Sequence, residues 1–244
     1  NDLLKIMGEC PYDNGGYFII NGMEKVIVSQ EKASSNNLYI NEINHPLYKY
    51  YAEIKSFSEI GFQAPRSNTI KILSNTNSIV VDIPRFRIPI PLFILFRALG
   101  INTDKDICNL IAFNLDEKLK NEICNELETS IRDVGPIFEQ DDALFFLEKY
   151  TRFKCIYHVY DIIQKELFPH VGTNFLNKAF YLGYAVNKLL LVKIGVIAKT
   201  DKDSFINKRI DLSGFLLSSL FRELFTDFYK NCNKNIDEIY NYNK

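Results

Sequence analysis

The sequence predicts an α+β fold in which a β-rich first third is followed by a helical region. Residues 1–90 hold short runs of β-branched and aromatic side chains separated by Asn, Gly, Ser and Pro, a pattern typical of strands and turns. Beyond residue 91, apolar side chains recur at the spacing of helices. Strands and helices do not alternate along the chain, so the pattern does not favour a parallel βαβ sheet.

The expected strands begin with a hairpin. Asn21 and Gly22 stand between two apolar runs, and both residue types tolerate the positive φ that a tight hairpin turn requires. Further short apolar runs bounded by turn residues predict the remaining strands. The expected strands cover residues 17–20, 25–29, 38–40, 50–57, 69–73 and 79–83.

The helical region follows a proline-rich segment, in which Pro84, Pro89 and Pro91 each push the preceding residue towards an extended conformation. The next helix is expected to end with Gly100 at its C′ position, Asp104 to cap the second helix and Asp116 to begin the third. The expected helices cover residues 92–99, 105–114, 117–127, 141–150, 157–167 and 174–197. The last is apolar nearly all round and is therefore placed at the centre of the core.

The final expected helix begins at Leu212 and has the clearest 3.6-residue period. Polar residues fill one face, and the polar tail, residues 232–244, is expected to fray. The opposite face carries Phe215, Leu216, Leu217, Leu220, Phe221, Leu224, Phe225 and Phe228.

Composition and charge exclude several classes of protein. A formal net charge of −1 provides no global field that would attract nucleic acid, so any such contact must come from a local patch. Five scattered cysteines without a CxxC pair indicate reduced thiols in an intracellular protein, and three histidines without ligand spacing argue against a zinc site. The apolar residues 179–198 are interrupted by Lys188 and Lys193, and each charge would cost about 3 kcal/mol in a bilayer. We expect a buried helix there and no membrane.

No pattern in the sequence predicts a catalytic residue, a metal ligand or a cofactor in this segment. Gly15-Gly16 precedes an expected strand rather than a helix N-terminus, so a turn is favoured over a phosphate-binding loop. Paired acidic residues are favoured as helix-capping or loop residues over ligands of a metal ion, and lone histidines as structural residues. These residues are Asp141, Asp142, Asp201, Asp203, His45 and His170.

Two short basic clusters leave a nucleic-acid contact open. Arg85 and Arg87 flank Phe86, and Lys208-Arg209 stands just before the last helix. Such clusters can contact phosphates, but two charges make a weak patch, and a solvated loop is the favoured interpretation of each.

Four ordered segments carry a resemblance to a known family. Residues 9–31 resemble the pattern ECP-x-D-x-GGYFIINGSEKV, and residues 90–100 resemble IPI-x-x-x-FRALG. Residues 167–170 with 178–191 resemble LPH…KA-[FY]-FLGY-x-x-NRLLL, and residues 201–214 resemble DD-x-DH-x-G-[KN]-[KR]-R-[LV]-DLAG. All four patterns belong to the second-largest (β-type) subunit of multisubunit DNA-directed RNA polymerases. The chain departs from the patterns at three positions: Ser204 and Ile206 stand where His and Gly are usual, and Pro89 stands where Asp is common.

The resemblance implies a fragment of that subunit. It implies a lobe domain at residues 37–208, inserted between the end of a first protrusion segment at residues 1–36 and a return segment at residues 209–244. The piece would form a structural wall of the DNA cleft without catalytic residues, while the largest subunit holds the Mg²⁺ of the full enzyme. Implied partners are the DNA template, the RNA product, the largest subunit and smaller subunits, and Lys208 and Arg209 are the expected nucleic-acid-facing residues.

The expected location is the nucleus for a cellular protein, or host cytoplasm or virion for a viral one, because the Asn-, Ile- and Lys-rich composition favours an AT-rich eukaryote or a large DNA virus. The alternative is a stand-alone, non-enzymatic interaction module with a lobe-like fold. If the lobe is an insertion, the chain should enter it (residues 31–37) and leave it (residues 207–211) at neighbouring points. The face containing Phe215, Leu216, Phe221 and Leu224 should then cover the hairpin at residues 17–28.

Overall fold

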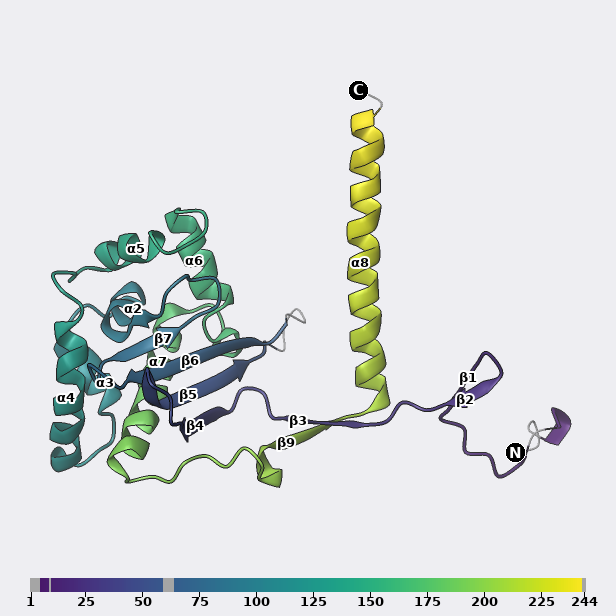
Figure 1. The fold of residues 1–244 in the computed structure, drawn as a ribbon, viewed down its shortest axis with the longest axis horizontal. Helices are drawn as coiled ribbons and strands as arrows, with labels where there is room; N and C mark the ends of the chain where they lie inside the picture. Colours follow the sequence, from purple (N-terminus) through teal and green to yellow (C-terminus); the bar gives the residue numbers. More distant parts are fainter. Residues whose placement is uncertain (1–4, 9, 59–63, 243–244) are drawn as a thin grey trace. The chain divides into compact units, whose positions relative to one another are not determined.

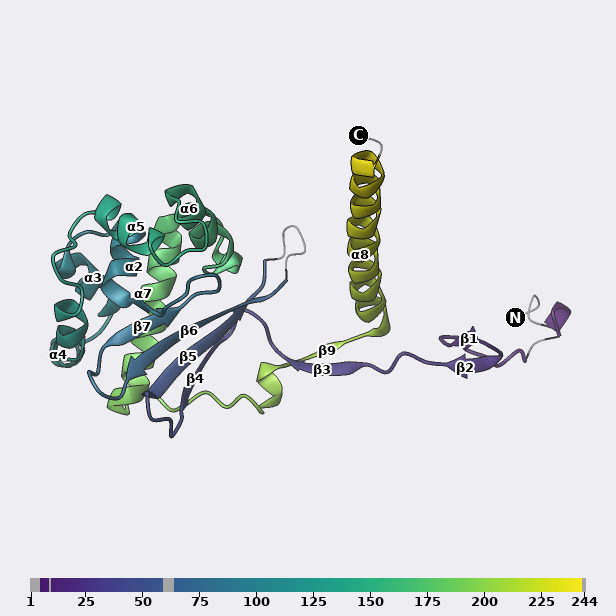
Figure 2. The ribbon, with the colours of Figure 1, turned by 45° about the horizontal axis from the view of Figure 1, so that its top comes forward.

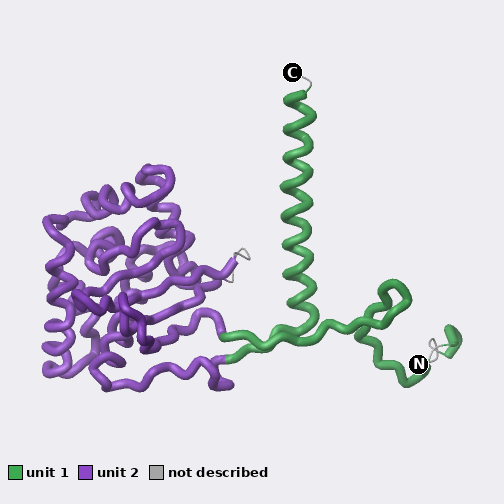
Figure 3. The backbone as a smooth tube through the Cα atoms, in the orientation of Figure 1, with its two compact units in different colours: residues 1–33, 208–244 green, residues 34–207 purple. Residues whose placement is uncertain are grey.

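The computed structural model describes residues 5–8, 10–58 and 64–242, and Glu9 of the first motif lies outside this part. The chain divides into two compact units (Figure 3). Unit 1 consists of residues 1–33 and 208–244, and unit 2 consists of residues 34–207. Strands precede most helices in the described chain, so the predicted α+β class is confirmed.

Unit 2 contains a five-stranded antiparallel sheet in the order β4-β5-β6-β7-β8 (Figure 1). Its register follows the alternation of the sequence: Ala52, Ile54 and Ser56 of β5 are buried, whereas Lys55 is exposed. Neighbouring strands in the chain are neighbours in the sheet, as expected for short connections. The strands are β4 (Leu38–Glu42), β5 (Tyr48–Ser56), β6 (Arg66–Leu73), β7 (Ile79–Asp82) and β8 (Ile90–Pro91).

The helices of unit 2 gather on one face of this sheet (Figures 1 and 2). The buried apolar residues of the sheet and of the helices form one core cluster. At its centre lie α2, in which every residue is buried, and α7, which packs against β4, β5 and α3. The helical elements are α2 (Leu92–Ala98), α3 (Asp104–Ile111), α4 (Glu117–Arg132), α5 (Gln140–Glu148), α6 (Ile156–Lys165), η1 (Pro169–Val171), α7 (Phe175–Ile194) and η2 (Phe205–Asn207).

The helix ends follow local chemistry, with one correction. Gly100 has φ +99° directly after the α2 C-cap, as predicted. The predicted cap Asp104 is instead the first residue of α3, because the Thr103 hydroxyl accepts a hydrogen bond from the Asp106 N–H at 3.1 Å. Asp104 is thereby free to pair with Arg97 of α2 at 2.5 Å. The acidic pair Asp141-Asp142 lies in the first turn of α5, as expected.

The contact between α3 and α7 depends on a glycine. A Cβ atom on Gly183 would lie 1.8 Å from Leu110 Cδ2, which is far closer than two carbon atoms can approach. The absence of a side chain at this position lets α3 pack directly against the backbone of the core helix.

Unit 1 begins with a hairpin formed by β1 (Phe18–Ile20) and β2 (Met23–Lys25), and Asn21 and Gly22 both have positive φ in the turn. The hairpin was predicted, but the expected second strand at residues 25–29 was misplaced. Strand β2 pairs only as far as Lys25, and the chain resumes as β3 (Gln30–Ala33).

Strand β3 pairs in antiparallel register with β9 (Lys208–Asp211), so that Lys32 faces Arg209 (Figure 1). We call this pair the β3–β9 ribbon. Directly beyond it, the Ser34 N–H donates to the Asn207 carbonyl at 2.8 Å. The chain therefore enters and leaves unit 2 at neighbouring points, as expected for an insertion.

The last helix, α8 (Ser213–Tyr242), differs from expectation in two ways. It runs through the tail that was expected to fray, because Ile236 and Tyr240 continue the apolar spacing and Lys234 pairs with Glu238 one turn on. Its apolar face does not cover the hairpin: Phe221 of α8 remains 69% exposed, and Ile19 of the hairpin remains 70% exposed. Both surfaces of unit 1 are therefore open in this structure.

Candidate nucleic-acid interface

Lys208 and Arg209 are the first residues of β9. Successive side chains of a strand point to opposite faces, so the two residues project to opposite sides of the β3–β9 ribbon. Lys208 Nζ lies 3.2 Å from Glu31 Oε1 on the facing strand, and an Arg209 Nη1 hydrogen donates to the Lys208 carbonyl at 2.7 Å. The geometry does not aim both charges at one site.

The charge of the ribbon is nearly balanced. On one face of the ribbon Lys32 Nζ lies 2.7 Å from Asp211 Oδ2, and on the opposite face Lys208 pairs with Glu31. Together with Arg209, the ribbon carries three basic and two acidic side chains, which leaves a net charge of +1. A single excess charge is a weak attraction for a phosphate backbone.

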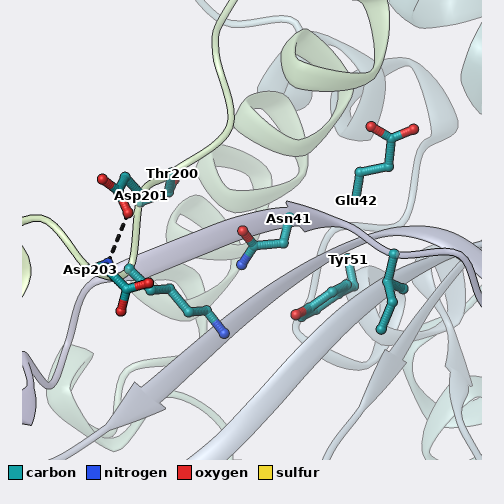
Figure 4. Close-up of a pocket in the computed structure, with 8 residues that line it drawn as sticks. Asn41, Glu42, Tyr51, Thr200, Asp201 and Asp203 are labelled. Carbon is teal, nitrogen blue, oxygen red and sulfur yellow. Dashed lines mark hydrogen bonds between the residues drawn. The ribbon is translucent and has the colours of Figure 1, made fainter.

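A hollow of about 370 Å³ lies on unit 2 beside the segment that follows α7 (Figure 4). The Asp203 N–H donates to Asp201 Oδ1 at 2.9 Å, which fixes the turn of this loop. Three carboxylates and one ammonium group line the hollow, so its charge disfavours a phosphate. The lining residues are Asn41, Glu42, Ile43, Tyr51, Thr200, Asp201, Lys202 and Asp203.

Lys202 anchors this loop to the outer face of the sheet. Its Nζ atom lies 3.1 Å from Glu53 Oε2 and above the rings of Tyr39 and Tyr51, at 5.8 and 5.7 Å from their centroids. Burial by itself disfavours the charged amine, but the hydrogen bond and charge of Glu53, with a smaller contribution from Tyr51, raise the pKa of Lys202. Lys202, the middle residue of the 201–203 loop, therefore has a structural role.

Arg85, in the basic cluster around Phe86, is engaged by an ion pair inside unit 2. Arg85 Nε lies 2.9 Å from Glu166 Oε1, and Arg66 Nε lies 2.8 Å from Glu166 Oε2. Glu166 is fully buried, so its two arginine partners compensate a charge that would otherwise be costly. Arg87 is exposed, and its backbone N–H donates to the Tyr150 carbonyl at 3.1 Å. The ion pair with Glu166 accounts for the arginine at position 85 without a phosphate ligand.

His170, in the short helix η1 that follows α6, has a structural partner, as expected. His170 Nδ1 lies 2.7 Å from Ser56 Oγ, and the His170 backbone N–H donates to the same oxygen at 3.2 Å. Ser56 is completely buried and its hydroxyl cannot reach a substrate. Burial, with a smaller effect of the nearby Lys178 charge, lowers the pKa of His170. The pair stabilises the fold rather than activating a nucleophile.

Two buried basic residues escaped the sequence analysis, although both lie in motifs that carry the resemblance. Lys178 is fully buried on α7, and its Nζ donates to the backbone carbonyls of Ile163, Gln164 and Leu167 at 2.7, 2.7 and 2.6 Å. These carbonyls lie at the C-terminal end of α6, where a helix leaves its carbonyl groups unsatisfied. A lysine at the start of a mostly apolar helical run was the available signal.

Arg97 of α2 is the second of these residues and is 2% exposed. Its Nη2 pairs with Asp104 Oδ1, and its guanidinium lies 5.4 Å from the centroid of the Phe138 ring. The pairing explains why an arginine occurs in an otherwise apolar helix.

The described residues contain no cluster of three or more His, Cys, Asp or Glu side chains placed to hold a metal ion. Within the same part of the chain, no helix has the length and apolar character needed to cross a membrane.

Comparison with known proteins connects this geometry to a family. The family model described as RNA polymerase Rpb2, domain 2, matches residues 25–211. The chain is 41% identical over 229 residues to DNA-directed RNA polymerase II subunit RPB2 of Encephalitozoon cuniculi, covering 90% of this chain and 20% of that protein. It is 38% identical over 237 residues to DNA-directed RNA polymerase II subunit 2 of Arabidopsis thaliana, with the same two coverages.

An archaeal relative, DNA-directed RNA polymerase subunit Rpo2 of Saccharolobus shibatae, is 39% identical over 243 residues, covering 94% of this chain and 20% of that protein. The chain thus spans about a fifth of the length of these relatives. The resemblance seen in the four sequence motifs is confirmed. Because the family model matches most of the chain, the chain belongs to the RNA polymerase Rpb2 domain 2 family, a part of second-largest RNA polymerase subunits.

Proposed function

We propose that this chain is the lobe region, with adjoining protrusion segments, of the second-largest subunit of a DNA-directed RNA polymerase. In this role it forms a structural wall of the DNA cleft and supplies no catalytic residue. The observation that carries the proposal is the β3–β9 ribbon, because unit 2 holds its own core and is joined to unit 1 by two paired strands. This is the arrangement of an inserted domain.

Contacts within unit 2 support a structural role for residues that otherwise resemble functional groups. His170 is engaged by Ser56, Arg85 by the buried Glu166, and Lys202 by Glu53. In the assembled enzyme the chain would act with the largest subunit, which would hold the Mg²⁺ for nucleotidyl transfer, and with smaller subunits, template DNA and product RNA. The eukaryotic relatives support a nuclear location.

The open surfaces of unit 1 support a place within a larger subunit. The apolar face of α8 and the β1–β2 hairpin expose large side chains, including Phe221 and Ile19. Exposed apolar patches of this kind mark surfaces that bind other protein. We assign both surfaces to contacts with further parts of the same subunit.

The experiment that tests the wall function removes unit 2. In the full-length subunit that carries this segment, residues 34–207 are replaced by a short Gly-Ser linker between Ala33 and Lys208, which face each other in the ribbon. We expect the assembled enzyme to extend RNA on a preformed template–RNA scaffold at the normal rate and to lose open promoter complexes faster. Loss of extension on the scaffold, in an enzyme that assembles normally, would contradict a purely structural role.

Lys208 and Arg209 are proposed as phosphate contacts. Each neutralised phosphate contributes roughly one unit to the slope of log affinity against log salt concentration. In the assembled enzyme, replacing both residues by Ala is expected to shorten the lifetime of open complexes and to flatten its salt dependence without changing sequence preference. The alternative is that Lys208 stiffens the ribbon through Glu31. An unchanged salt slope together with lower thermal stability would decide for that alternative.

A further inference from the structure

The turn that joins the neighbouring helices α5 and α6 carries basic side chains that the sequence analysis did not single out (Figure 1). Lys149, Arg152 and Lys154 stand within six consecutive residues, and all three are exposed. Residues 149–160 include no Asp or Glu. This local excess of positive charge contrasts with the net charge of −1 of the whole chain.

A buried threonine fixes the shape of this turn. The Thr151 hydroxyl donates to the Glu148 carbonyl at 2.9 Å and accepts from the Lys154 N–H at 3.2 Å. Thr151 is completely buried, so these hydrogen bonds anchor the turn to unit 2. Lys154 has φ +45°, a conformation that residues other than glycine seldom adopt. The turn therefore has a defined shape that directs its basic side chains to the surface.

A second segment adds another basic residue to the turn. The Arg87 N–H donates to the Tyr150 carbonyl at 3.1 Å, which places the two backbones side by side, and Arg87 is exposed. In the described part of the chain these basic side chains have no carboxylate partner, whereas Arg85 and Lys165 are both engaged in ion pairs. We call the following four residues the α5–α6 basic cluster: Arg87, Lys149, Arg152 and Lys154.

Two exposed aromatic rings accompany the charges. Phe153 is 67% exposed, and Tyr157 in the first turn of α6 is 81% exposed. The Arg152 guanidinium lies 5.5 Å from the centroid of the Phe153 ring, and the His158 ring meets that ring at 76° with the centroids 4.9 Å apart. These contacts hold the Phe153 ring beside the cluster while most of its surface stays open to solvent.

We propose that the α5–α6 basic cluster, with Phe153 and Tyr157, is a binding surface for single-stranded nucleic acid. Its cations contact successive phosphates, and the two rings stack on unpaired bases. A duplex offers phosphates but keeps its bases stacked on each other, and an acidic protein segment offers carboxylates but no flat ring. A single strand is the polyanion that uses both the charges and the rings. The surface lies on unit 2 and is independent of Lys208 and Arg209 in the ribbon.

The test measures the fluorescence anisotropy of a labelled oligo(dT) of about 20 nucleotides as the 244-residue chain is added at low salt. We expect a dissociation constant of about 10⁻⁶–10⁻⁴ M. Each phosphate contact of a single strand adds about 0.7 to the slope of log affinity against log salt, so four cations predict a slope of about −2.8. Oligo(U) of the same length is titrated in parallel, and the tighter ligand identifies DNA or RNA as the preferred strand. A duplex of the same length should bind more weakly than either.

Two triple variants remove equal charge from different places. Replacing Lys149, Arg152 and Lys154 by Gln should weaken binding at least about tenfold and reduce the slope to about −0.7, because only Arg87 remains. The control replaces three exposed lysines of α3 and α4 that stand among acidic residues, and it should change affinity by less than about twofold. The control lysines are Lys105, Lys118 and Lys120.

The aromatic contribution is tested with Phe153→Leu, which keeps every charge and an apolar side chain. It should weaken binding of the single strand about tenfold and leave the salt slope unchanged. Photocross-linking of an oligonucleotide that contains 5-bromodeoxyuridine to the unaltered chain gives an answer that does not depend on the folding of a variant. The cross-linked peptide should contain Phe153 or Tyr157.

Four results would overturn the proposal: no binding of either strand at low salt, equal weakening by both triple variants, tighter binding of the duplex or of polyglutamate than of the single strand, or cross-links confined to unit 1. The variant with Lys208→Ala and Arg209→Ala should bind oligo(dT) like the unaltered chain. A loss of binding in that variant alone would favour the ribbon contacts and contradict this surface. The two proposals can therefore fail separately.

Discussion

Replacing Lys178 with methionine should destabilise unit 2 strongly, although the change removes a buried charge. Methionine keeps a similar length but cannot donate to the three carbonyls at the end of α6 that Lys178 satisfies. A hydrogen bond to a charged group contributes about 1.5–3 kcal/mol, so three contribute about 4.5–9 kcal/mol.

The opposing contribution is the cost of burying the amine. Burial lowers the pKa of Lys178 from its ordinary value of 10.5 to about 8, and a difference of that size corresponds to about 3 kcal/mol. The variant regains this cost, so the net loss in the free energy of unfolding should be about 2–6 kcal/mol. A loss of this size is a large part of the stability of an ordinary domain.

The assay is urea unfolding of the 244-residue chain, followed by the near-ultraviolet circular dichroism of its tyrosines, since the chain contains no tryptophan. Lys165→Met is the matched control. Lys165 is the last residue of α6, but its side chain is 58% exposed and pairs only with Asp161 across one helical turn. Such an exposed pair contributes less than about 1 kcal/mol. A Lys178→Met variant no less stable than the Lys165→Met variant would refute the reasoning.

The pH dependence gives a second, independent check. Folded Lys178 releases its proton near pH 8, whereas the unfolded chain keeps it up to about pH 10.5, so the unfolded state binds more protons in that window. The stability of the wild type relative to Lys178→Met should therefore rise between pH 8 and about 10.5, by up to about 3 kcal/mol. If the difference in stability between the two proteins stays constant across this pH range, the pKa of Lys178 is not lowered in the folded state, and the reasoning is wrong.

Three further substitutions test other contacts of unit 2 by the same assay. Gly183→Ala should lower stability by about 1–3 kcal/mol because its methyl group meets a side chain of α3, whereas Gly214→Ala, with open space around it, should cost nothing. Glu166→Gln should lower stability by about 3–5 kcal/mol because two arginines lose a buried partner, and Glu128→Gln, in an exposed pair, should change it by less than about 1 kcal/mol. The pKa of His170 is lowered in the folded state, so the unfolded chain takes up the proton first and stability should fall as the pH drops below about 6.5. His170→Asn should make this fall less steep. An equally steep fall in the variant would contradict the assignment to His170.

Local patterns predicted most elements of unit 2 because these elements depend on short-range signals. The alternation in β5 indicates which face of the strand is buried, and the nearly all-round apolar character of α7 places that helix in the core. Gly100 and the Asn21-Gly22 turn were predictable because positive φ restricts the choice of residue. The cap of α3 was misassigned because Thr103 and Asp104 are both good N-cap residues, and the pairing of Asp104 with Arg97 depends on tertiary packing.

The parts that the sequence analysis missed depend on contacts between distant residues. Strands β3 and β9 read QEKA and KRID, and these polar tetrapeptides carry no strand signal of their own. Lys178 and Arg97 were noted only as parts of the family motifs. Their roles as hydrogen-bond donors depend on Leu167 and Asp104, which only the folded structure brings next to them. The placement of Lys208 and Arg209 relative to DNA remains a prediction, because it depends on neighbours outside this chain.

The β3–β9 ribbon also has a consequence for the order of folding. It joins Lys32 to Arg209, which are 177 positions apart (209 minus 32). Closing a loop of that length in an unfolded chain costs about 4–5 kcal/mol of entropy, more than a pair of four-residue polar strands can return. Once unit 2 has folded, the Ser34–Asn207 hydrogen bond already holds the two ends together. The ribbon should therefore form after unit 2 has folded. A mutation that unfolds the core of unit 2 should also separate β3 from β9, even though the ribbon itself carries no mutation.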